Sequence, residues 1–139
     1  MSRIAIIVPG IGYTTDRSLL YFAGKVAQNA GYELQKIQFS GFEKGVKGNP
    51  EKMKRAFSHA YEQLLEKQGK SRRSDMIIFH GLADPWAADN DSMRVIAEQR
   101  GVEYHELPGA NHSLETGNPI VDMDSQKKTM EICQRFLYA

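Results

Sequence analysis

The sequence predicts one three-layer α/β domain in which four mostly parallel strands lie between helices. Apolar runs of strand length alternate four times with segments whose apolar residues recur at helical spacing, the pattern of a parallel sheet covered on both faces. The first run, at 4–8, is apolar throughout, as expected for a parallel strand buried on both faces. The 139 residues contain no internal repeat or linker, so a single domain spanning 1–139 is expected.

The first half of the chain contains two strand–helix units. After the strand at 4–8, a helix is expected to begin at a side-chain cap within 14–16 and to end at Gly31. The strand at 32–39 carries polar residues, which favours an edge of the sheet. The Asn49–Pro50 pair then predicts a second helix, whose apolar spacing is the most regular in the chain.

The second half repeats this alternation. A short apolar strand at 76–79 is expected to stop where His80 and Gly81 break the run. A helix capped by Asp89 or Asp91 should follow. That helix is expected to end at Gly101. A strand at 102–107, a loop at 115–125 and a last helix at 126–138 are expected after it.

The polar second strand leads to a predicted strand order of 2-1-3-4, which is flavodoxin-like or Rossmann-like in outline. In such sheets a ligand binds where the strand order reverses, here between the first and third strands. The residues expected to converge there are Gly10, Gly12, His80 and Asp84, with His112 one strand further over.

Charge, hydropathy and cysteine content exclude several classes of function. The chain has 18 Lys and Arg against 17 Asp and Glu, so no strong field should attract nucleic acid or an anionic membrane. No stretch approaches the roughly 18 apolar residues of a membrane helix, and no signal-peptide segment precedes the first strand. The single cysteine, Cys133, is expected to be a small buried core residue. A cytoplasmic protein without a cofactor is expected.

Two loops carry the side chains that are suited to acid–base chemistry. The segment HGLADPW at 80–86 presents Asp84 just past a strand, because Pro85 cannot continue a strand and restricts the residue before it. The segment PGANHSLE at 108–115 presents His112 past the next strand. An acid followed by a histidine, each on the loop after its own strand, matches the second half of a hydrolase triad.

With VPGIG at 8–12, these segments resemble the α/β-hydrolase superfamily, in the group of small serine hydrolases without an elaborate lid. The order of motifs and elements matches over nearly the whole chain. The resemblance implies that Asp84 orients His112 and that His112 is a general base for an ester substrate. It also implies that the turn of Gly10, Ile11 and Gly12 supplies backbone amides to an oxyanion hole.

The chain departs from this family at the nucleophile. No serine stands in a G-x-S-x-G elbow between a strand and a helix. The nearest match, at 69–73 around Ser71, lacks the final glycine and precedes a strand. A hydrolase also needs two further strand–helix units before its acid loop, and the chain has room for one strand there. We infer that an elbow strand is joined to an acid strand near Phe79 and His80, through a natural deletion or in an engineered miniature.

Each site residue also has a purely structural interpretation. Asp84 could shape an Asx turn, and Gly10–Gly12 could be a turn or an anion cradle. His80, Asp84 and His112 form a conceivable zinc site, although their spacing does not support one. Trp86 is expected to cover the mouth of the cleft or to stack on a ligand. Ser113 is the hydroxyl nearest to the presumed site, but its side chain should point away from the neighbouring imidazole.

Two functions of different classes follow. The first is a hydrolase-like domain with an acid–histidine pair and little or no esterase activity. The second is a non-catalytic module that binds a small or anionic ligand, or that self-associates as a homodimer through apolar surface exposed by the missing segment. An active esterase with an atypical nucleophile, Ser71 or Ser113, ranks third.

Overall fold

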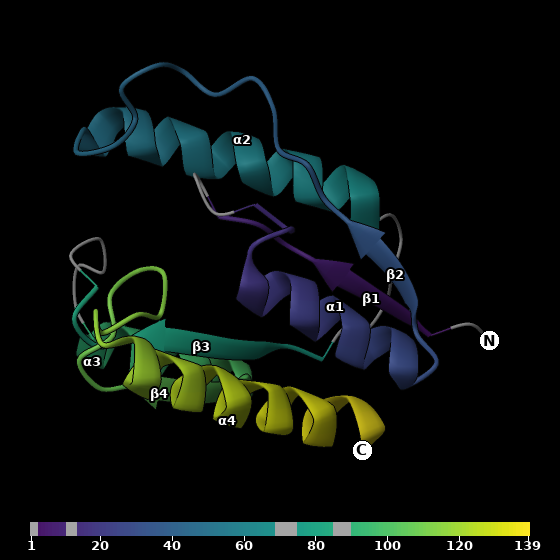
Figure 1. The fold of residues 1–139 in the computed structure, drawn as a ribbon. Helices are drawn as coiled ribbons and strands as arrows, with labels where there is room; N and C mark the ends of the chain where they lie inside the picture. Colours follow the sequence, from purple (N-terminus) through teal and green to yellow (C-terminus); the bar gives the residue numbers. More distant parts are fainter. Residues whose placement is uncertain (1–2, 11–13, 69–74, 85–89) are drawn as a thin grey trace. The chain divides into compact units, whose positions relative to one another are not determined.

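The computed structural model describes residues 3–10, 14–68, 75–84 and 90–139. These residues form a mixed α/β structure with four helices and two two-stranded parallel sheets (Figure 1). The chain divides into two compact units, Met1–Arg73 and Ser74–Ala139, each with the order strand–helix–strand–helix. The predicted alternation of strands and helices is therefore confirmed.

The first unit begins with a parallel strand pair and the helix that connects the strands. β1 (Ile4–Ile7) pairs with β2 (Glu33–Lys36), and α1 (Ser18–Asn29) packs on both. Gly31 follows α1 with a φ of 82°, which confirms the predicted end of this helix. The predicted side-chain cap within 14–16 is wrong. The cap position is Arg17, which makes no side-chain cap hydrogen bond.

The second helix of this unit, α2 (Pro50–Gln68), begins as the Asn–Pro pair predicts, with Asn49 Oδ1 accepting from the N–H of Lys52 at 3.0 Å. Polar contacts hold α2 to the loop that precedes it. The Ser40 N–H donates to the Gln63 side chain, and the Ser40 carbonyl accepts from His59 and Gln63. The apolar stripe of the helix remains largely exposed, at 68% for Phe57, 61% for Tyr61 and 46% for Leu65.

The second unit is built on the parallel pair of β3 (Ile77–Gly81) and β4 (Glu103–Leu107). The prediction that His80 and Gly81 break the third strand is wrong, because they are its last two residues. The buried His80 ring bonds to Asn90 and stacks on the Tyr104 ring, and these contacts keep a polar residue within the strand.

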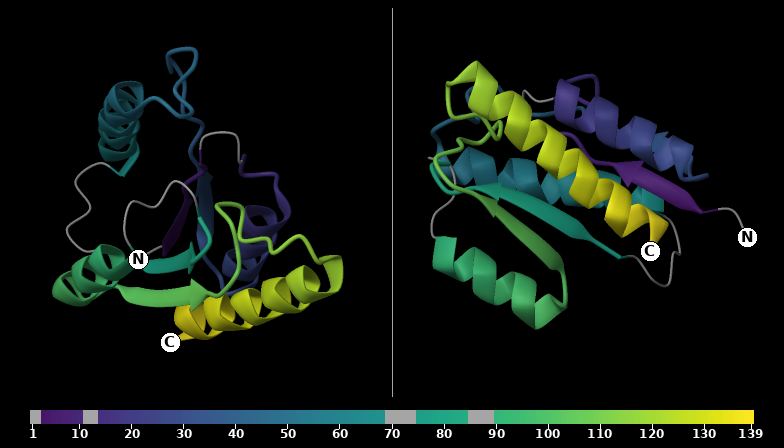
Figure 2. Two further views of the ribbon diagram at one scale, coloured as in Figure 1. Left: turned by 90° about the vertical axis from the view of Figure 1, so that its left-hand side faces the viewer. Right: turned by 60° about the horizontal axis from the view of Figure 1, so that its bottom comes forward.

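Two helices cover opposite faces of this pair. α3 (Asn90–Arg100) contacts β4, and α4 (Pro119–Tyr138) runs along β3, as the two views of Figure 2 show. Because successive strand residues point to opposite faces, Glu103 reaches Arg135 of α4 while Glu106 reaches Arg94 of α3. Cys133 is buried on α4, as predicted.

The last helix is longer than the sequence predicted. A loop was expected at 115–125, but α4 begins at Pro119, and the Asn118 side chain accepts from the N–H groups of Ile120 and Val121. This is the same Asn–Pro start as in α2. The apolar residues of its first turn are exposed, so they do not continue the buried periodicity on which the prediction depended.

Two of the three predicted strand neighbours are present in the described residues. The neighbours 2-1 and 3-4 are present as parallel pairs, but the described residues do not show a four-stranded sheet of order 2-1-3-4. In the described part of the chain, no helix is both long and apolar enough to cross a membrane.

Candidate acid–histidine site

The site lies at the carboxyl ends of β3 and β4. The last residues of the two strands, Gly81 and Leu107, are partners in the parallel register, so both following loops start at the same edge. Each loop begins with a turn whose closing hydrogen bond is accepted by the carbonyl of the last strand residue. The Asp84 N–H donates to Gly81 O at 3.1 Å, and the Ala110 N–H donates to Leu107 O at 3.2 Å. The sequence therefore brings the acid loop and the histidine loop together through the strand pairing.

The two loops are also bonded to each other. The Leu82 N–H donates to Leu107 O at 3.1 Å, and the Ala83 N–H donates to Ala110 O at 2.9 Å. A Cβ atom on Gly81 would lie 2.3 Å from Asn111 O and 2.4 Å from Ala110 O. Glycine is thus required at the end of β3, because the backbone of the histidine loop occupies the space of a side chain.

The predicted contact between the acid and the histidine is present. Asp84 Oδ2 lies 2.8 Å from His112 Nδ1. The Asp84 side chain is only 10% exposed, whereas that of His112 is 51% exposed. An ionised carboxylate only accepts hydrogen bonds, so Nδ1 carries the proton and the neutral ring keeps its lone pair on Nε2. The roles that the resemblance implies for the two residues remain predictions.

Asn111 holds the histidine loop in shape. Its Oδ1 accepts from the N–H groups of Ser113 at 2.8 Å and Glu115 at 3.2 Å, and its own N–H donates to Glu115 O at 2.8 Å. Leu114 has a φ of 61°, in the left-handed region that costs a residue with a side chain about 1 kcal/mol or more. The side-chain oxygen of Asn111 thus fixes the tight turn on which the adjacent His112 lies.

His112 differs from the other three histidines in its bonding. The rings of His59, His80 and His105 bond through Nε2, to Ser40 O, Asn90 Oδ1 and Glu103 Oε1 respectively. Within the described residues, His112 is the one histidine that bonds through Nδ1. Among the described residues no hydrogen bond is made to Nε2 of this half-exposed ring.

His80 does not join the site. It is 6% exposed, and its Nε2 donates to Asn90 Oδ1 at 2.7 Å, while the Asn90 amide donates to Leu82 O at 3.2 Å. This His80–Asn90 bridge was missed by sequence reasoning, since only the three-dimensional structure pairs a strand end with the following helix start. Among the described residues, no group of three or more His, Cys, Asp or Glu is arranged to hold a metal ion.

The other predicted site residues are not brought to the acid–histidine pair. Gly10 is exposed in the first unit, and its place in an oxyanion hole remains a prediction. Ile11, Gly12, Ser71 and Trp86 lie outside the described residues. Ser113 lies in the histidine loop, where the structure gives its hydroxyl no hydrogen bond to the His112 ring within the described part of the chain.

Charged residues of β4 bind the helices on either side. Hydrogen bonds from His105 and then Arg135 lower the pKa of Glu103 below its ordinary value. A hydrogen bond from Arg94 does the same for the pKa of Glu106. Burial raises the pKa of the Cys133 thiol to about 11, so this thiol stays protonated and unreactive near neutral pH. The two glutamates thus tie β4 to α3 and α4, and within the described residues their hydrogen bonds do not include Asp84 or His112.

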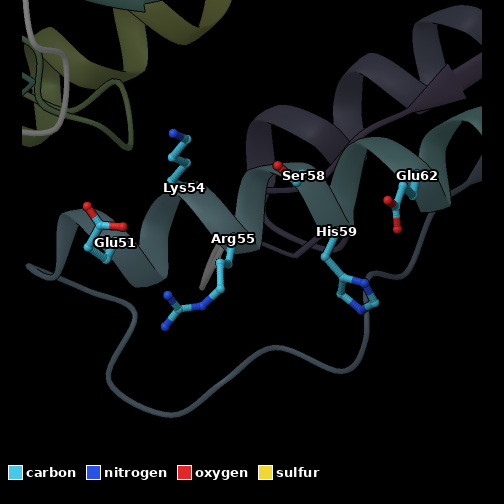
Figure 3. A pocket seen from close by; sticks show the side chains of 6 residues that line it. All are labelled: Glu51, Lys54, Arg55, Ser58, His59 and Glu62. Carbon is cyan, nitrogen blue, oxygen red and sulfur yellow. The ribbon is translucent and has the colours of Figure 1, made fainter.

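An open depression of about 440 Å³ lies elsewhere, along α2 (Figure 3). Its labelled side chains all come from one helix and carry both signs of charge. They are Glu51, Lys54, Arg55, Ser58, His59 and Glu62. Arg55 pairs with Glu43, and His59 bonds to Ser40 O, so neither is directed at a ligand. This surface is therefore not a second candidate site.

Comparison of the chain with protein-family models, curated proteins and solved structures found no match. Function is therefore inferred from the geometry of the chain itself.

Proposed function

We propose that the chain is an α/β-hydrolase-like domain that keeps an oriented acid–histidine pair without a serine nucleophile, and that it hydrolyses small esters weakly. The observation that carries this proposal is the 2.8 Å contact between Asp84 Oδ2 and His112 Nδ1, on loops that leave neighbouring parallel strands. This is the relation that an orienting acid and a general base have in a triad.

The expected rate is low because the nucleophile is missing. No serine stands in the elbow pattern, and Ser113 lies beside His112 in the same tight turn. In serine hydrolases that lose a triad member, binding and the oxyanion hole still give about 10³–10⁴-fold over water. The acid–histidine pair alone should give a rate no higher than this.

The proposal includes the complete sheet. We propose that β1 lies beside β3, giving the order 2-1-3-4, and that Gly10, Ile11 and Gly12 turn toward the pair as an oxyanion hole. Support for the joined strand comes from β3, which runs without interruption from Ile77 to Gly81 across the inferred junction of Phe79 and His80. The small ester, the absence of a cofactor and a cytoplasmic location belong to the same proposal.

A serine-reactive fluorophosphonate tests for a hidden nucleophile. The chain is incubated with the reagent and its intact mass is read, with His112→Ala as the control. No adduct on a serine is expected. A stoichiometric serine adduct that disappears in His112→Ala would overturn the proposal in favour of an active serine esterase using Ser71 or Ser113.

Hydrolysis of p-nitrophenyl acetate tests the pair directly. His112→Ala should lower the protein-catalysed rate by about 100-fold, the lower end of the range for a positioned acid–base group. Asp84→Asn should also lower it, because the ring loses its fixed tautomer. Equal rates for the wild type and both variants would show that the pair has no chemical role.

A second candidate function, self-association, is favoured by the α2 stripe. Phe57, Tyr61 and Leu65 lie at i, i+4 and i+8 on one helical face, and exposed apolar groups of this kind indicate a surface that another element covers. The proposed occupant is a second copy of the chain. Charge supports this choice, since the first unit has 13 Lys and Arg against 6 Asp and Glu, and the second has 5 against 11.

Light scattering at several protein and salt concentrations tests self-association. Self-association predicts a dimer that Phe57→Ser abolishes and that added salt weakens, while Ser58→Ala on the neighbouring position leaves it intact. If the complete four-stranded sheet covers the stripe instead, the chain is monomeric and Phe57→Ser lowers its stability.

A further inference from the structure

We propose that His112 is itself the nucleophile, and that its Nε2 takes the acyl group of activated esters and thioesters before water releases it. This inference rests on the proposed function, because it uses the same acid–histidine pair. It goes further by naming the attacking atom, the covalent intermediate and the class of substrate.

The geometry selects one nitrogen of one ring. The Asp84 carboxylate accepts from His112 Nδ1–H, so the lone pair of the neutral ring is on Nε2. The His112 side chain is 51% exposed while that of Asp84 is 10% exposed, so the acid is sheltered and the ring is accessible to solvent. In the other three histidines Nε2 donates to an oxygen acceptor, so the lone pair lies on Nδ1, beside the ring carbon that carries Cβ, where access is more crowded.

The covalent step balances without any further group. The Nε2 lone pair attacks the carbonyl carbon of the ester, a C–N bond forms, and the C–O or C–S bond breaks with its electron pair leaving on the phenolate or thiolate. The ring then carries an acyl group on Nε2 and a proton on Nδ1, and is a cation. The Asp84 carboxylate, 2.8 Å from Nδ1, stabilises that charge. Water next attacks the acyl carbon, the C–N electron pair returns to Nε2, and the released proton goes to solvent.

The leaving group determines which substrates react. Imidazole has a conjugate-acid pKa of about 6.5, so it leaves an acyl carbon far more readily than an alkoxide does. With an alkyl ester, the tetrahedral intermediate therefore expels imidazole and returns to the starting materials. Phenolates and thiolates, with conjugate acids of pKa roughly 8.5–10, compete with imidazole as leaving groups. Aryl esters and thioesters are the expected substrates, and simple alkyl esters and amides are not.

The experiment combines trapping with an isotope comparison. The wild-type chain is mixed with excess p-nitrophenyl acetate, and its intact mass is read by rapid-mixing mass spectrometry near neutral pH, because an acyl imidazole hydrolyses readily in acid. Ethyl acetate is the alkyl ester for comparison. The initial burst of p-nitrophenolate, which reports formation of the acyl intermediate before water releases it, is then followed in H₂O and D₂O. His59→Ala is the matched control, because His59 is also an exposed histidine but bonds to a backbone carbonyl through Nε2.

The expected result is one acetyl group on the wild-type chain that is absent from His112→Ala, a burst rate that is nearly equal in H₂O and D₂O, and no reaction with ethyl acetate. His112→Ala should lower the rate by about 100-fold, and His59→Ala should leave it unchanged. A His112-dependent rate that is clearly slower in D₂O, with no acetyl adduct, overturns nucleophilic attack and leaves the proposed function standing as general-base catalysis. A rate that is the same in His112→Ala overturns the proposed function as well.

Discussion

The two units share one order of elements but differ in how the second helix is held. In the first unit, α2 bonds to its preceding loop through polar groups, and its apolar stripe is exposed. In the second unit, α4 packs along β3 and is joined to β4 by the Arg135–Glu103 ion pair. The loops of the second unit are also bonded to each other beyond the strand ends. The proposed catalysis by Asp84 and His112 needs this kind of fixed framework, which the second unit has and the α2 region lacks.

The units also differ in charge. The overall net charge of +1 conceals a basic first unit and an acidic second unit. In the second unit, Glu103, Glu106 and Asp122 each accept hydrogen bonds from fixed donors. Its acidic groups therefore take part in holding loops and helices. The difference between the units can be tested by substitutions that change packing and by the pH dependence of stability.

The largest expected effect is on the close approach of the two loops in the second unit. Gly81→Ala should lower the free energy of unfolding by about 2 kcal/mol, within the range for overpacking, because the new Cβ would meet the carbonyl oxygens of Asn111 and Ala110. It should also displace His112 and abolish its contact with Asp84. Chemical denaturation measures the first effect and ester hydrolysis the second.

Gly24→Ala is the matched change in the first unit. Its Cβ would lie 3.1 Å from the flexible end of Leu34, and the helix gains about 0.5–1 kcal/mol from alanine, so little net change is expected. If Gly81→Ala proves as harmless as Gly24→Ala, the loops of the second unit are not packed as described.

The next effect concerns the helix caps. Asn118→Ala removes the acceptor for two N–H groups at the start of α4 and should cost about 1 kcal/mol of global stability, because α4 packs on the sheet. Asn49→Ala removes the equivalent cap of α2. Because α2 packs on its loop, the loss should appear as local opening of α2 in hydrogen exchange. An equal loss of global stability in both variants would show that α2 and α4 are packed equally well on the rest of the structure.

The smallest effect is the response to acid. The pKa of each of the carboxyls Glu103, Glu106 and Asp122 is lowered in the folded chain, so their contribution to stability is present at neutral pH. That contribution starts to fall as the pH drops to about 4.5 for the two glutamates and about 3.8 for Asp122, and it is lost as the pH passes below the lowered folded values. In the first unit, Glu43 is the one described carboxyl with such a shift.

Hydrogen exchange between neutral pH and about pH 3 should therefore show the second unit losing protection before the first. Glu106→Gln should reduce the pH dependence of the second unit and leave that of the first unchanged. If the first unit loses its protection from exchange at a higher pH than the second, the proposed difference in acid response between the units is wrong.

Much of the order of strands and helices could be predicted because apolar spacing distinguishes the two kinds of element, although it did not show that the α2 stripe is exposed. Gly31 and the Asn49–Pro50 pair marked their helix boundaries correctly, as local backbone chemistry decides these positions. The end of β3 could not be predicted from local sequence, because His80 remains in the strand through its contacts with Asn90 and Tyr104. The pairing of β1 with β3 stays a prediction.

The site divides in the same way. Asp84 and His112 could be identified because each follows a strand, and strand order then brings them together. The requirement for Gly81 could not, since it arises from carbonyl groups 29 and 30 residues further along the chain. The tautomer of His112 could not be predicted either, because the hydrogen-bond acceptor of each histidine ring is known only from the structure.

The tautomers of the four histidines provide the most direct test. Long-range ¹H–¹⁵N correlation spectra at a pH where the rings are neutral distinguish a proton on Nδ1 from one on Nε2. The structure predicts Nδ1–H for His112 and Nε2–H for His59, His80 and His105. In Asp84→Ala, the His112 signal alone should change. An Nε2–H tautomer for His112 in the wild type, or a signal that Asp84→Ala leaves unaltered, would contradict the oriented acid–histidine pair.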